Sequence, residues 1–341
     1  MKTICIYHSV DLDGWMSAAI VRLWHEQKTN NTSIDLDKVE NSISPTKNII
    51  HGEEENLLCF KGYTYGDKVP DVSEYDNIIM CDISFLKSVM EHLHDNEHKT
   101  VTWIDHHESA INSSKVFKRY DDLKGIRNTN FAACELTWQY YFPNEPMPEI
   151  IRLLGRYDCF GHKGTDEEQK VLEFQYGARC KITNYKEAYN YLIKDINRYI
   201  TQDITQDINQ IILQLGRGVY IHLCEEAKLI YKRKIDVKFQ EPIRGQGGQL
   251  LNIEVRRFAV INATRFNPIN FNIDYHTEGY DGVACFWYEK DKWNFSLYND
   301  NGKVNVSSIA LTFGGSGHRG AAGFIVDELK NIINIDTRYE S

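Results

Sequence analysis

The sequence lacks long hydrophobic runs. None of its apolar stretches approaches the length of a membrane-spanning helix, and the N-terminus has no basic region followed by a long apolar segment. We therefore expect neither a membrane partner nor a signal peptide. The eight cysteines show no CxxC spacing, and several lie in apolar runs, where buried free thiols are common. A reducing cytoplasm is the simplest location for such a protein.

Positive charge is also in deficit, since 39 Lys and Arg stand against 48 Asp and Glu and the net charge is -9. Proteins that hold long nucleic acids through many phosphate contacts present extended basic faces. We therefore expect no long duplex as a partner. A small anionic substrate is compatible with this charge, because a local cluster of cations is enough to bind one or two phosphates.

The length of 341 residues exceeds what one ordinary core requires and favours two domains. In the first part of the chain, short β-prone runs predict strands of a parallel α/β sheet at 3–7, 77–81 and 100–104. Helical spacing predicts helices at 17–26, 131–141, 149–158 and within 185–234. Short β-rich runs then predict a smaller α+β domain, with strands at 254–261, 282–288 and 293–298 and a helix at 306–313.

Residues of metal-binding type follow each predicted strand of the first domain. These residues are His8, Asp11 and Asp13, then Asp82, then Asp105, His106 and His107. The carboxyl ends of parallel strands meet at one edge of a sheet, so we expect one crevice to collect these side chains. Crowded carboxylates repel one another unless a cation lies between them. Their oxygens together with imidazole nitrogens suit Mn²⁺, Fe²⁺ or Zn²⁺, and mostly oxygen ligation also admits Mg²⁺.

Each motif also has a simpler interpretation. Asp11 could cap the following helix, and His8 could satisfy a buried hydrogen bond. The glycine-rich segment 314–323 could bind an anion through exposed N–H groups and the neighbouring pair His318 and Arg319. It could equally be a tight connection between a helix and a strand.

With these motifs in this order, the chain resembles the DHH phosphoesterases that carry the DHH-associated C-terminal domain. This branch of the RecJ superfamily includes nanoRNases, bisphosphonucleotide phosphatases and cyclic-dinucleotide-cleaving enzymes. The matching motifs are His8-x-x-Asp11-x-Asp13-Gly14, Asp82, Asp105-His106-His107, Asp158 and the segment Gly314 to Gly323. The resemblance covers nearly the whole chain. It implies a catalytic domain at 1–184, a helical connection at 185–240 and a substrate-binding domain at 241–341, with the active site in the cleft between the domains.

The resemblance also implies a role for each residue. One metal ion would be held by His8, Asp11 and Asp82, and the other by Asp13, Asp82, His106 and Asp158. His107 would face the substrate phosphate, and Asp105 would orient a histidine by accepting its remaining N–H. Substrate binding would fall to Gly315, Ser316, Gly317, His318, Arg319 and Tyr298. Tyr298 stands where relatives often carry arginine, so it could stack on a base or simply lie in the core.

The implied reaction is hydrolysis of phosphodiester bonds in short oligonucleotides or dinucleotides by two-metal activation of water. Mn²⁺ is the expected cation and Mg²⁺ the alternative. Two other functions stay open. A 3′,5′-bisphosphonucleotide phosphatase would need the same two metal ions, and a non-catalytic nucleotide-binding protein could retain the same fold.

Overall fold

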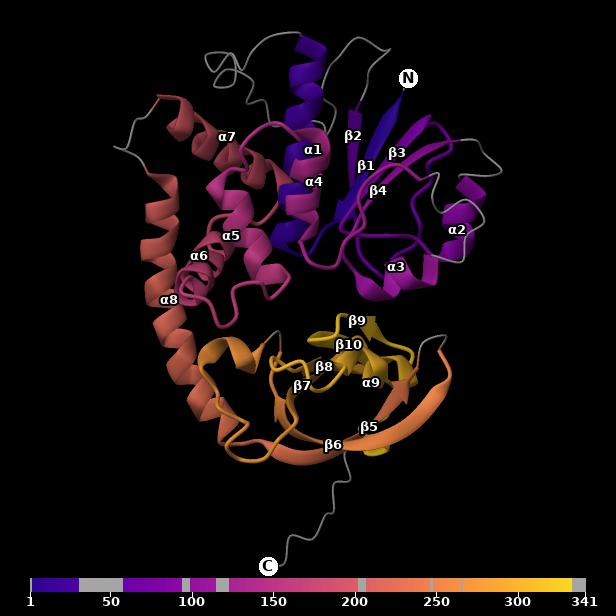
Figure 1. Cartoon of the computed structure of the whole chain (residues 1–341), viewed down its shortest axis with the longest axis vertical. Coiled ribbons are helices and arrows are strands. Elements are labelled where there is room, and N and C mark those ends of the chain that lie inside the picture. The colour runs from indigo at the N-terminus through magenta and orange to yellow at the C-terminus, as the bar shows by residue number, and fades with distance from the viewer. Residues whose placement is uncertain are drawn as a thin grey trace, which may run out of the picture. The chain divides into compact units, whose positions relative to one another are not determined.

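A computed structural model (Figure 1) describes residues 2–30, 58–93, 99–114, 123–201, 207–245, 248–264 and 266–332. The chain divides into two units, Met1–Arg217 and Gly218–Ser341. Helix α8 (Ile208–Tyr231) begins in the first unit and ends in the second. Within the described ranges, no helix combines the length and the apolar character needed to cross a membrane.

A four-stranded parallel sheet organises the first unit. Its strands are β1 (Thr3–His8), β2 (Leu58–Tyr63), β3 (Asn77–Cys81) and β4 (Thr100–Ile104). They pair in the order β2-β1-β3-β4, and every pairing is parallel. The chain therefore leaves β1 on one side to form β2 and returns on the other side to form β3. This makes the carboxyl ends of β1 and β3 a topological switch point, the place where open α/β sheets bind ligands.

Helices cover both faces of this sheet (Figure 1). The helices of this part of the unit are α1 (Leu12–Asn30), α2 (Lys87–Glu91), α3 (Glu108–Ser114), α4 (Ala133–Tyr141), α5 (Glu149–Asp158), α6 (Glu168–Arg179) and α7 (Tyr185–Thr201). Alternate residues of β1 serve different cores, since Ile4 and Ile6 pack with side chains of α2 and α3. Cys5 instead packs with Val21 of α1 and Leu136 of α4. Successive residues of β1 point to opposite faces of the sheet, and both faces are buried, as is usual for a parallel sheet.

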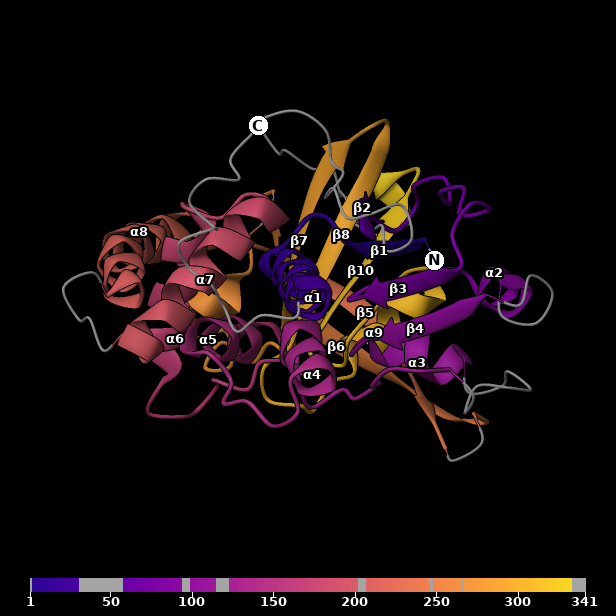
Figure 2. The same ribbon diagram turned by 90° about the horizontal axis from the view of Figure 1, so that it is seen from above.

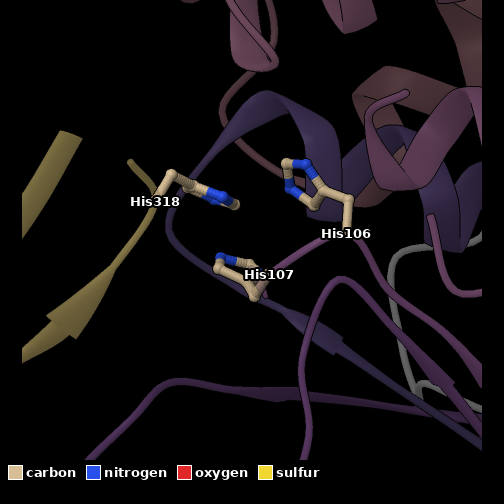
Figure 3. Close-up of side chains that lie close together, drawn as sticks. All are labelled: His106, His107 and His318. Carbon is tan, nitrogen blue, oxygen red and sulfur yellow. The ribbon is translucent and has the colours of Figure 1, made fainter. Parts of the chain in front are cut away.

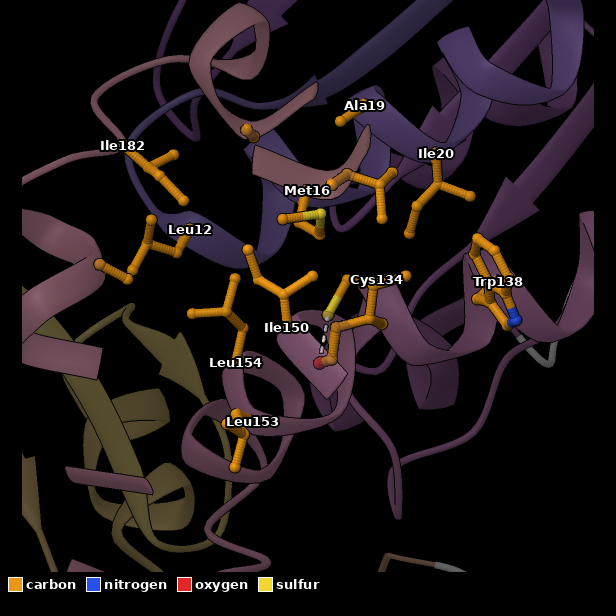
Figure 4. Packing of buried hydrophobic residues seen from close by; sticks show 14 of the residues in the cluster. Leu12, Met16, Ala19, Ile20, Cys134, Trp138, Ile150, Leu153, Leu154 and Ile182 are labelled. Carbon is orange, nitrogen blue, oxygen red and sulfur yellow. Dashed lines mark hydrogen bonds between the residues drawn. The ribbon is translucent and has the colours of Figure 1, made fainter. Parts of the chain in front are cut away.

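A further core joins α1 to α4, α5, α6, α7 and α8 (Figure 4). Met16 and Ile20 of α1 share it with Ile150 and Leu154 of α5. Helices α6 and α8 approach closely at a glycine, since a Cβ on Gly216 would lie only 1.7 Å from a backbone oxygen of α6. This packing holds α5 in place, and with it the residue at its carboxyl end.

The second unit is built on a six-stranded mixed sheet. Its strands are β5 (Ile235–Arg244), β6 (Leu250–Asn262), β7 (Gly282–Glu289), β8 (Lys292–Tyr298), β9 (Ser316–Gly317) and β10 (Ala321–Val326), in the order β5-β6-β7-β8-β10-β9. Only the β6–β7 pairing of this sheet is parallel. Figure 2 shows β7 and β8 side by side. Helix α9 (Val306–Thr312) packs Ile309 onto Phe258 and Phe295 of the sheet, and short 3-10 turns lie at η5 (Pro268–Phe271) and η6 (Leu329–Asn331).

The predicted fold class is confirmed: a parallel α/β domain comes first and a smaller α+β domain follows. The expected strands at 77–81 and 100–104 and the helix at 149–158 have the predicted bounds. Strands β2 and β5 and helix α6 were not expected, and α1 begins at Leu12, five residues before the predicted start. The three-part division at 184 and 240 stays a prediction.

Candidate metal centre

The carboxyl ends of three strands place the predicted site residues at one edge of the first sheet. His8 is the last residue of β1, Asp82 follows β3 directly, and His106 and His107 come just after β4. Asp158 ends α5 and so comes from the helical layer, yet its Oδ2 lies 3.2 Å from His106 Nε2. The structure thus brings the six predicted metal ligands together at the switch point.

Gly14 shapes the turn between β1 and α1. A Cβ at this position would lie 2.0 Å from the backbone oxygen of His8, so only glycine fits. The tight turn lets Asp11 serve two purposes. Its Oδ1 accepts a hydrogen bond from the Gly14 N–H at 3.0 Å, and its Oδ2 lies 2.8 Å from His8 Nδ1. Asp11 therefore caps α1 with one oxygen and faces the site with the other.

Asp82 lies between two groups of donor atoms. Its Oδ2 is 3.4 Å from His8 Nδ1, and its Oδ1 is 3.2 Å from His106 Nε2. The backbone φ of Asp82 is 61°, a left-handed conformation that residues other than glycine seldom adopt and that aspartate tolerates better than most. Backbone strain of this kind is found at sites where the orientation of a side chain matters.

The second donor group surrounds His106. Its Nε2 lies 3.4 Å from Asp13 Oδ2 and 3.2 Å from Asp158 Oδ2. Helix α4 fixes Asp13 from behind, because the backbone N–H groups of Ala133 and Cys134 donate to its two oxygens at 2.9 and 2.7 Å. The first N–H groups of a helix have no partner within it and favour a carboxylate. Asp13 therefore has a fixed position before any ligand binds.

Asp105 is fully buried and holds the ring of His107. Its Oδ2 accepts a hydrogen bond from Trp103 Nε1 at 3.0 Å, and its Oδ1 accepts from the backbone N–H groups of His106 and His107. The same Oδ1 lies 2.8 Å from His107 Nδ1. Figure 3 shows the His106 and His107 rings as neighbours, with centroids 4.8 Å apart. A carboxylate in this place sets both the tautomer and the direction of the His107 ring.

The crowding of carboxylates shifts the pKa values of the site. Burial raises the pKa of Asp158 to about 6, with a further rise from Asp11 and Asp82 that His106 partly offsets. Burial lowers the pKa of His8, but Asp11 and Asp82 raise it more, so that it reaches about 11. The raised pKa values mean that Asp158 and His8 hold their protons more tightly, because a proton balances part of the cluster's negative charge. Bound cations would balance the same charge.

The donor set fits divalent metal ions. Among the groups of three residues whose donor atoms lie within 4.8 Å of one another are two that match the predicted ligands: His8, Asp11 and Asp82, and Asp13, His106 and Asp158. Both groups combine carboxylate oxygens with an imidazole nitrogen, a mixture that suits Mn²⁺, Fe²⁺ or Zn²⁺. Asp82 faces His106 of the second group as well as His8 of the first, so this one carboxylate could serve both.

No protein-family model matches the chain. It is 25% identical over 337 residues to the uncharacterized protein R106 of Acanthamoeba polyphaga mimivirus, covering 97% of this chain and 69% of that protein. It is also 23% identical over 341 residues to the bifunctional oligoribonuclease and PAP phosphatase NrnA of Mycoplasma genitalium, covering 97% of this chain and 91% of the relative. The alignment with this relative over nearly both chains agrees with the resemblance to the DHH phosphoesterases. Among solved structures, a pGpG-specific phosphodiesterase, PggH, from Vibrio cholerae is 12% identical, with a TM-score of 0.42 and coverage of 97% and 95%.

The glycine-rich segment of the second unit forms a tight hairpin. A Cβ on Gly315 would lie 2.1 Å from the Gly323 oxygen, and Gly317 has a φ of 142° with Ala322 directly against it. Ser316 pairs with Gly323 across the β9–β10 ladder. The close packing of this hairpin therefore favours glycine at 315 and 317.

The other predicted substrate-binding residues lie near this hairpin. The His318 N–H donates to the Ala321 oxygen at 2.7 Å, and Arg319 Nη2 donates to the Gly302 oxygen at 2.9 Å. Tyr298 is half-buried in β8, where it pairs with Val283 on one side and Ala321 on the other. Substrate binding by Gly315, Ser316, Gly317, His318, Arg319 and Tyr298 stays a proposal.

Tyr65 is a residue beside the site that sequence reasoning missed. It follows β2, and its ring centroid lies 6.2 Å from that of His8 and 6.0 Å from that of His107. About half of Tyr65 is exposed, at 48%. Because β2 was not expected, no signal in the sequence placed this tyrosine beside the DHH motif.

Proposed function

We propose that the chain is a metal-dependent phosphoesterase that hydrolyses phosphodiester bonds of short oligonucleotides or dinucleotides. The observation that carries this proposal is the geometry of Asp82, whose two oxygens face His8 and His106 in separate donor groups. One carboxylate shared by two cations is typical of two-metal phosphoesterases. The relative from Mycoplasma genitalium is named an oligoribonuclease, and its alignment spans nearly both chains, which supports a short oligonucleotide as substrate.

Under this proposal, each donor group holds one divalent cation, with Asp82 shared between them. The first set is His8, Asp11 and Asp82, and the second is Asp13, Asp82, His106 and Asp158. We expect Mn²⁺, with Mg²⁺ as the alternative. When bound, two such cations neutralise charge on the phosphoryl group and lower the pKa of a water to near neutrality.

Asp105 and His107 would act on the phosphoryl oxygens. Asp105 Oδ1 accepts the proton on His107 Nδ1, and His107 would face the substrate with its other ring nitrogen, Nε2. Burial lowers the pKa of His107, but Asp105 raises it more, and this favours a ring that carries both protons. His107 Nε2–H would then donate to a phosphoryl oxygen as negative charge develops there.

The second unit would bind the rest of the nucleotide. The proposed residues are Gly315, Ser316, Gly317, His318, Arg319 and Tyr298. Glycines without side chains leave backbone N–H groups within reach of an anion. The net charge of -9 supports a short substrate over a long duplex. We also propose that the protein works in the cytoplasm, as the cysteine spacing predicts.

Hydrolysis of a 3′,5′-bisphosphonucleotide is the second candidate. The name of the same relative includes PAP phosphatase as well as oligoribonuclease, so both activities are ascribed to that protein. A phosphomonoester would meet the same donor groups and differ only on the leaving-group side. The two candidates are therefore separated by substrate preference and not by the metal ligands.

The test is turnover of a substrate panel with Mn²⁺ and with a chelator. The panel holds di- to pentanucleotides, linear and cyclic dinucleotides, 3′,5′-bisphosphoadenosine and pyrophosphate. We expect cleavage of short diesters that depends on the metal. Preference for the bisphosphonucleotide would instead favour the phosphatase. Nucleotide binding without any turnover would contradict both and indicate a binding protein.

A further inference from the structure

Arg179 differs from the other arginines in the helical layer that carries Asp158. Arg152 pairs with Glu167, Arg156 with Glu135, and Arg198 with Asp207. Arg179 is the last residue of α6 and is exposed to solvent. Over the part of the chain that the structure describes, no carboxylate forms an ion pair with it. Its positive charge is therefore not neutralised by a direct partner within those residues.

Two tyrosines hold the Arg179 side chain in place. Its guanidinium lies 5.3 Å from the centre of the Tyr157 ring and 5.2 Å from that of Tyr176, and its Nη2 donates to the Tyr157 hydroxyl at 3.4 Å. Tyr157 is itself stacked on His162, whose Nδ1 lies 2.8 Å from the Arg156 oxygen. Cation–π contacts of this kind fix an arginine without using up its donors. The other N–H groups of Arg179 make no hydrogen bond to the described residues.

This held arginine lies close to the acidic cluster. Tyr157 directly precedes Asp158, one of the proposed metal ligands. Desolvation by neighbouring groups lowers the pKa of the Arg179 guanidinium, but the two tyrosines and the charges of Asp11 and Asp158 raise it more, so the net shift is upward. The charges of Asp11 and Asp158 therefore act on the guanidinium, although it forms no ion pair with either carboxylate.

We propose that Arg179 binds a second, non-scissile phosphate of the nucleotide substrate. The inference rests on the proposed function, because it assumes that the acidic cluster engages the scissile group through its cations. A planar guanidinium with unused N–H groups fits a phosphate through two parallel hydrogen bonds. The substrate class is then a short nucleotide with a phosphate next to the one that is cleaved, such as a 5′-phosphorylated dinucleotide. Arg179 is in this account a positioning residue.

A purely structural role for Arg179 makes a different prediction. A cation in the last turn of a helix interacts favourably with the helix dipole, and the contacts with Tyr157 and Tyr176 add stability. Loss of these effects would lower the unfolding temperature. Any change in KM would then be the same for all substrates. Binding of a second phosphate instead predicts a change in KM that depends on whether the substrate carries that phosphate.

The experiment compares the dinucleotide pApA with ApA, which lacks the 5′-phosphate, on the full-length protein with Mn²⁺. We expect Arg179→Gln to raise KM for pApA about 10-fold or more, leave KM for ApA within about twofold, and change kcat little. Arg179→Lys keeps the charge without the planar fork and should give an intermediate KM. Arg152→Gln is the matched control, since it removes a charge that Glu167 already pairs with, and it should leave both KM values unchanged.

Equal changes for the two dinucleotides, or none in either, would overturn the role of Arg179. If the wild type cleaves neither dinucleotide, the proposed function fails, and calorimetry then tests Arg179 separately. In that case the wild type should bind adenosine 3′,5′-bisphosphate more tightly than adenosine 5′-monophosphate, and Arg179→Gln should remove the difference. A wild type that binds the two equally would also refute the inference.

Discussion

At the residue scale, the site depends most on Asp82. Its oxygens face both donor groups, so its loss should disturb both proposed cations at once. We expect Asp82→Asn, which keeps the shape and removes the charge, to lower kcat by more than about 100-fold. Losing a residue that merely orients a ligand costs about 10–100-fold, and losing a shared ligand should cost more. Calorimetric titration with Mn²⁺ should show fewer than two ions bound per chain.

The matched control for this prediction is Asp71→Asn. Asp71 lies on the surface, where its Oδ1 accepts a hydrogen bond from the Ser73 N–H, and asparagine can accept the same bond. Its turnover and Mn²⁺ stoichiometry should match those of the wild type. Retention of two bound ions and near-normal turnover in Asp82→Asn would remove the basis for a shared carboxylate.

At the scale of elements, the turn from β1 into α1 makes the first donor group possible. We expect Gly14→Ala to lower the free energy of unfolding by about 1–3 kcal/mol, because the added Cβ would lie 2.0 Å from the His8 oxygen. The shifted turn should also weaken Mn²⁺ binding through His8 and Asp11. Urea unfolding and Mn²⁺ titration measure the two effects.

Gly218→Ala in α8 should raise the free energy of unfolding, the opposite of the effect expected for Gly14→Ala. A Cβ there meets no atom within 4 Å, and alanine is a better helix former than glycine by about 1 kcal/mol. The variant should therefore be more stable than the wild type and bind Mn²⁺ normally. If Gly14→Ala unfolds at the same urea concentration as Gly218→Ala, the close approach of Gly14 to His8 does not constrain the turn.

The elements also show which parts of the fold could be predicted from the sequence. Strands β3 and β4 are apolar runs of five residues each, and their bounds were predicted correctly. Strand β2 lies at the edge of its sheet, where residues such as Lys61 and Gly62 are tolerated. These residues interrupt the apolar run from which a strand would be predicted. Tyr65 follows β2 and Arg179 ends α6. Because neither element was expected, no sequence argument could place these two residues near the site.

At the scale of the whole molecule, topology explains why so much of the site was predictable. Residues at the ends of β1, β3 and β4 must meet, because parallel strands all end at the same edge. Asp158 follows no such rule, since it comes from α5, and its 3.2 Å approach to His106 depends on how the helical layer packs on α1. Its place in the site came from a motif match and not from physical reasoning about the chain.

The charge of the assembled cluster predicts how stability depends on pH. The pKa of Asp158 in the folded protein is about 6, above its ordinary 3.8, so its contribution is present below about pH 4 and is lost as pH rises through 6. The pKa of His8 is raised from 6.5 to about 11, so its contribution is lost as pH rises from about 6.5 towards 11. The pKa of Asp82 is lowered, and its contribution is lost only in more acidic solution. Between pH 5 and 8, the metal-free protein should therefore become less stable as pH rises.

Bound Mn²⁺ should reverse this trend, because a metal ion binds the deprotonated ligands and its affinity rises with pH. We expect the difference in unfolding temperature between Mn²⁺-saturated and chelator-treated protein to widen steadily from pH 5 to pH 8. Each 1 kcal/mol corresponds to about 2–4 °C for a domain of this size. Scanning calorimetry at four pH values measures the difference. Asp158→Asn removes one titrating carboxyl group, so without metal it should unfold at a higher temperature than the wild type at pH 8. A temperature difference that stays constant across this range would show that the carboxylates of the cluster do not bind the metal.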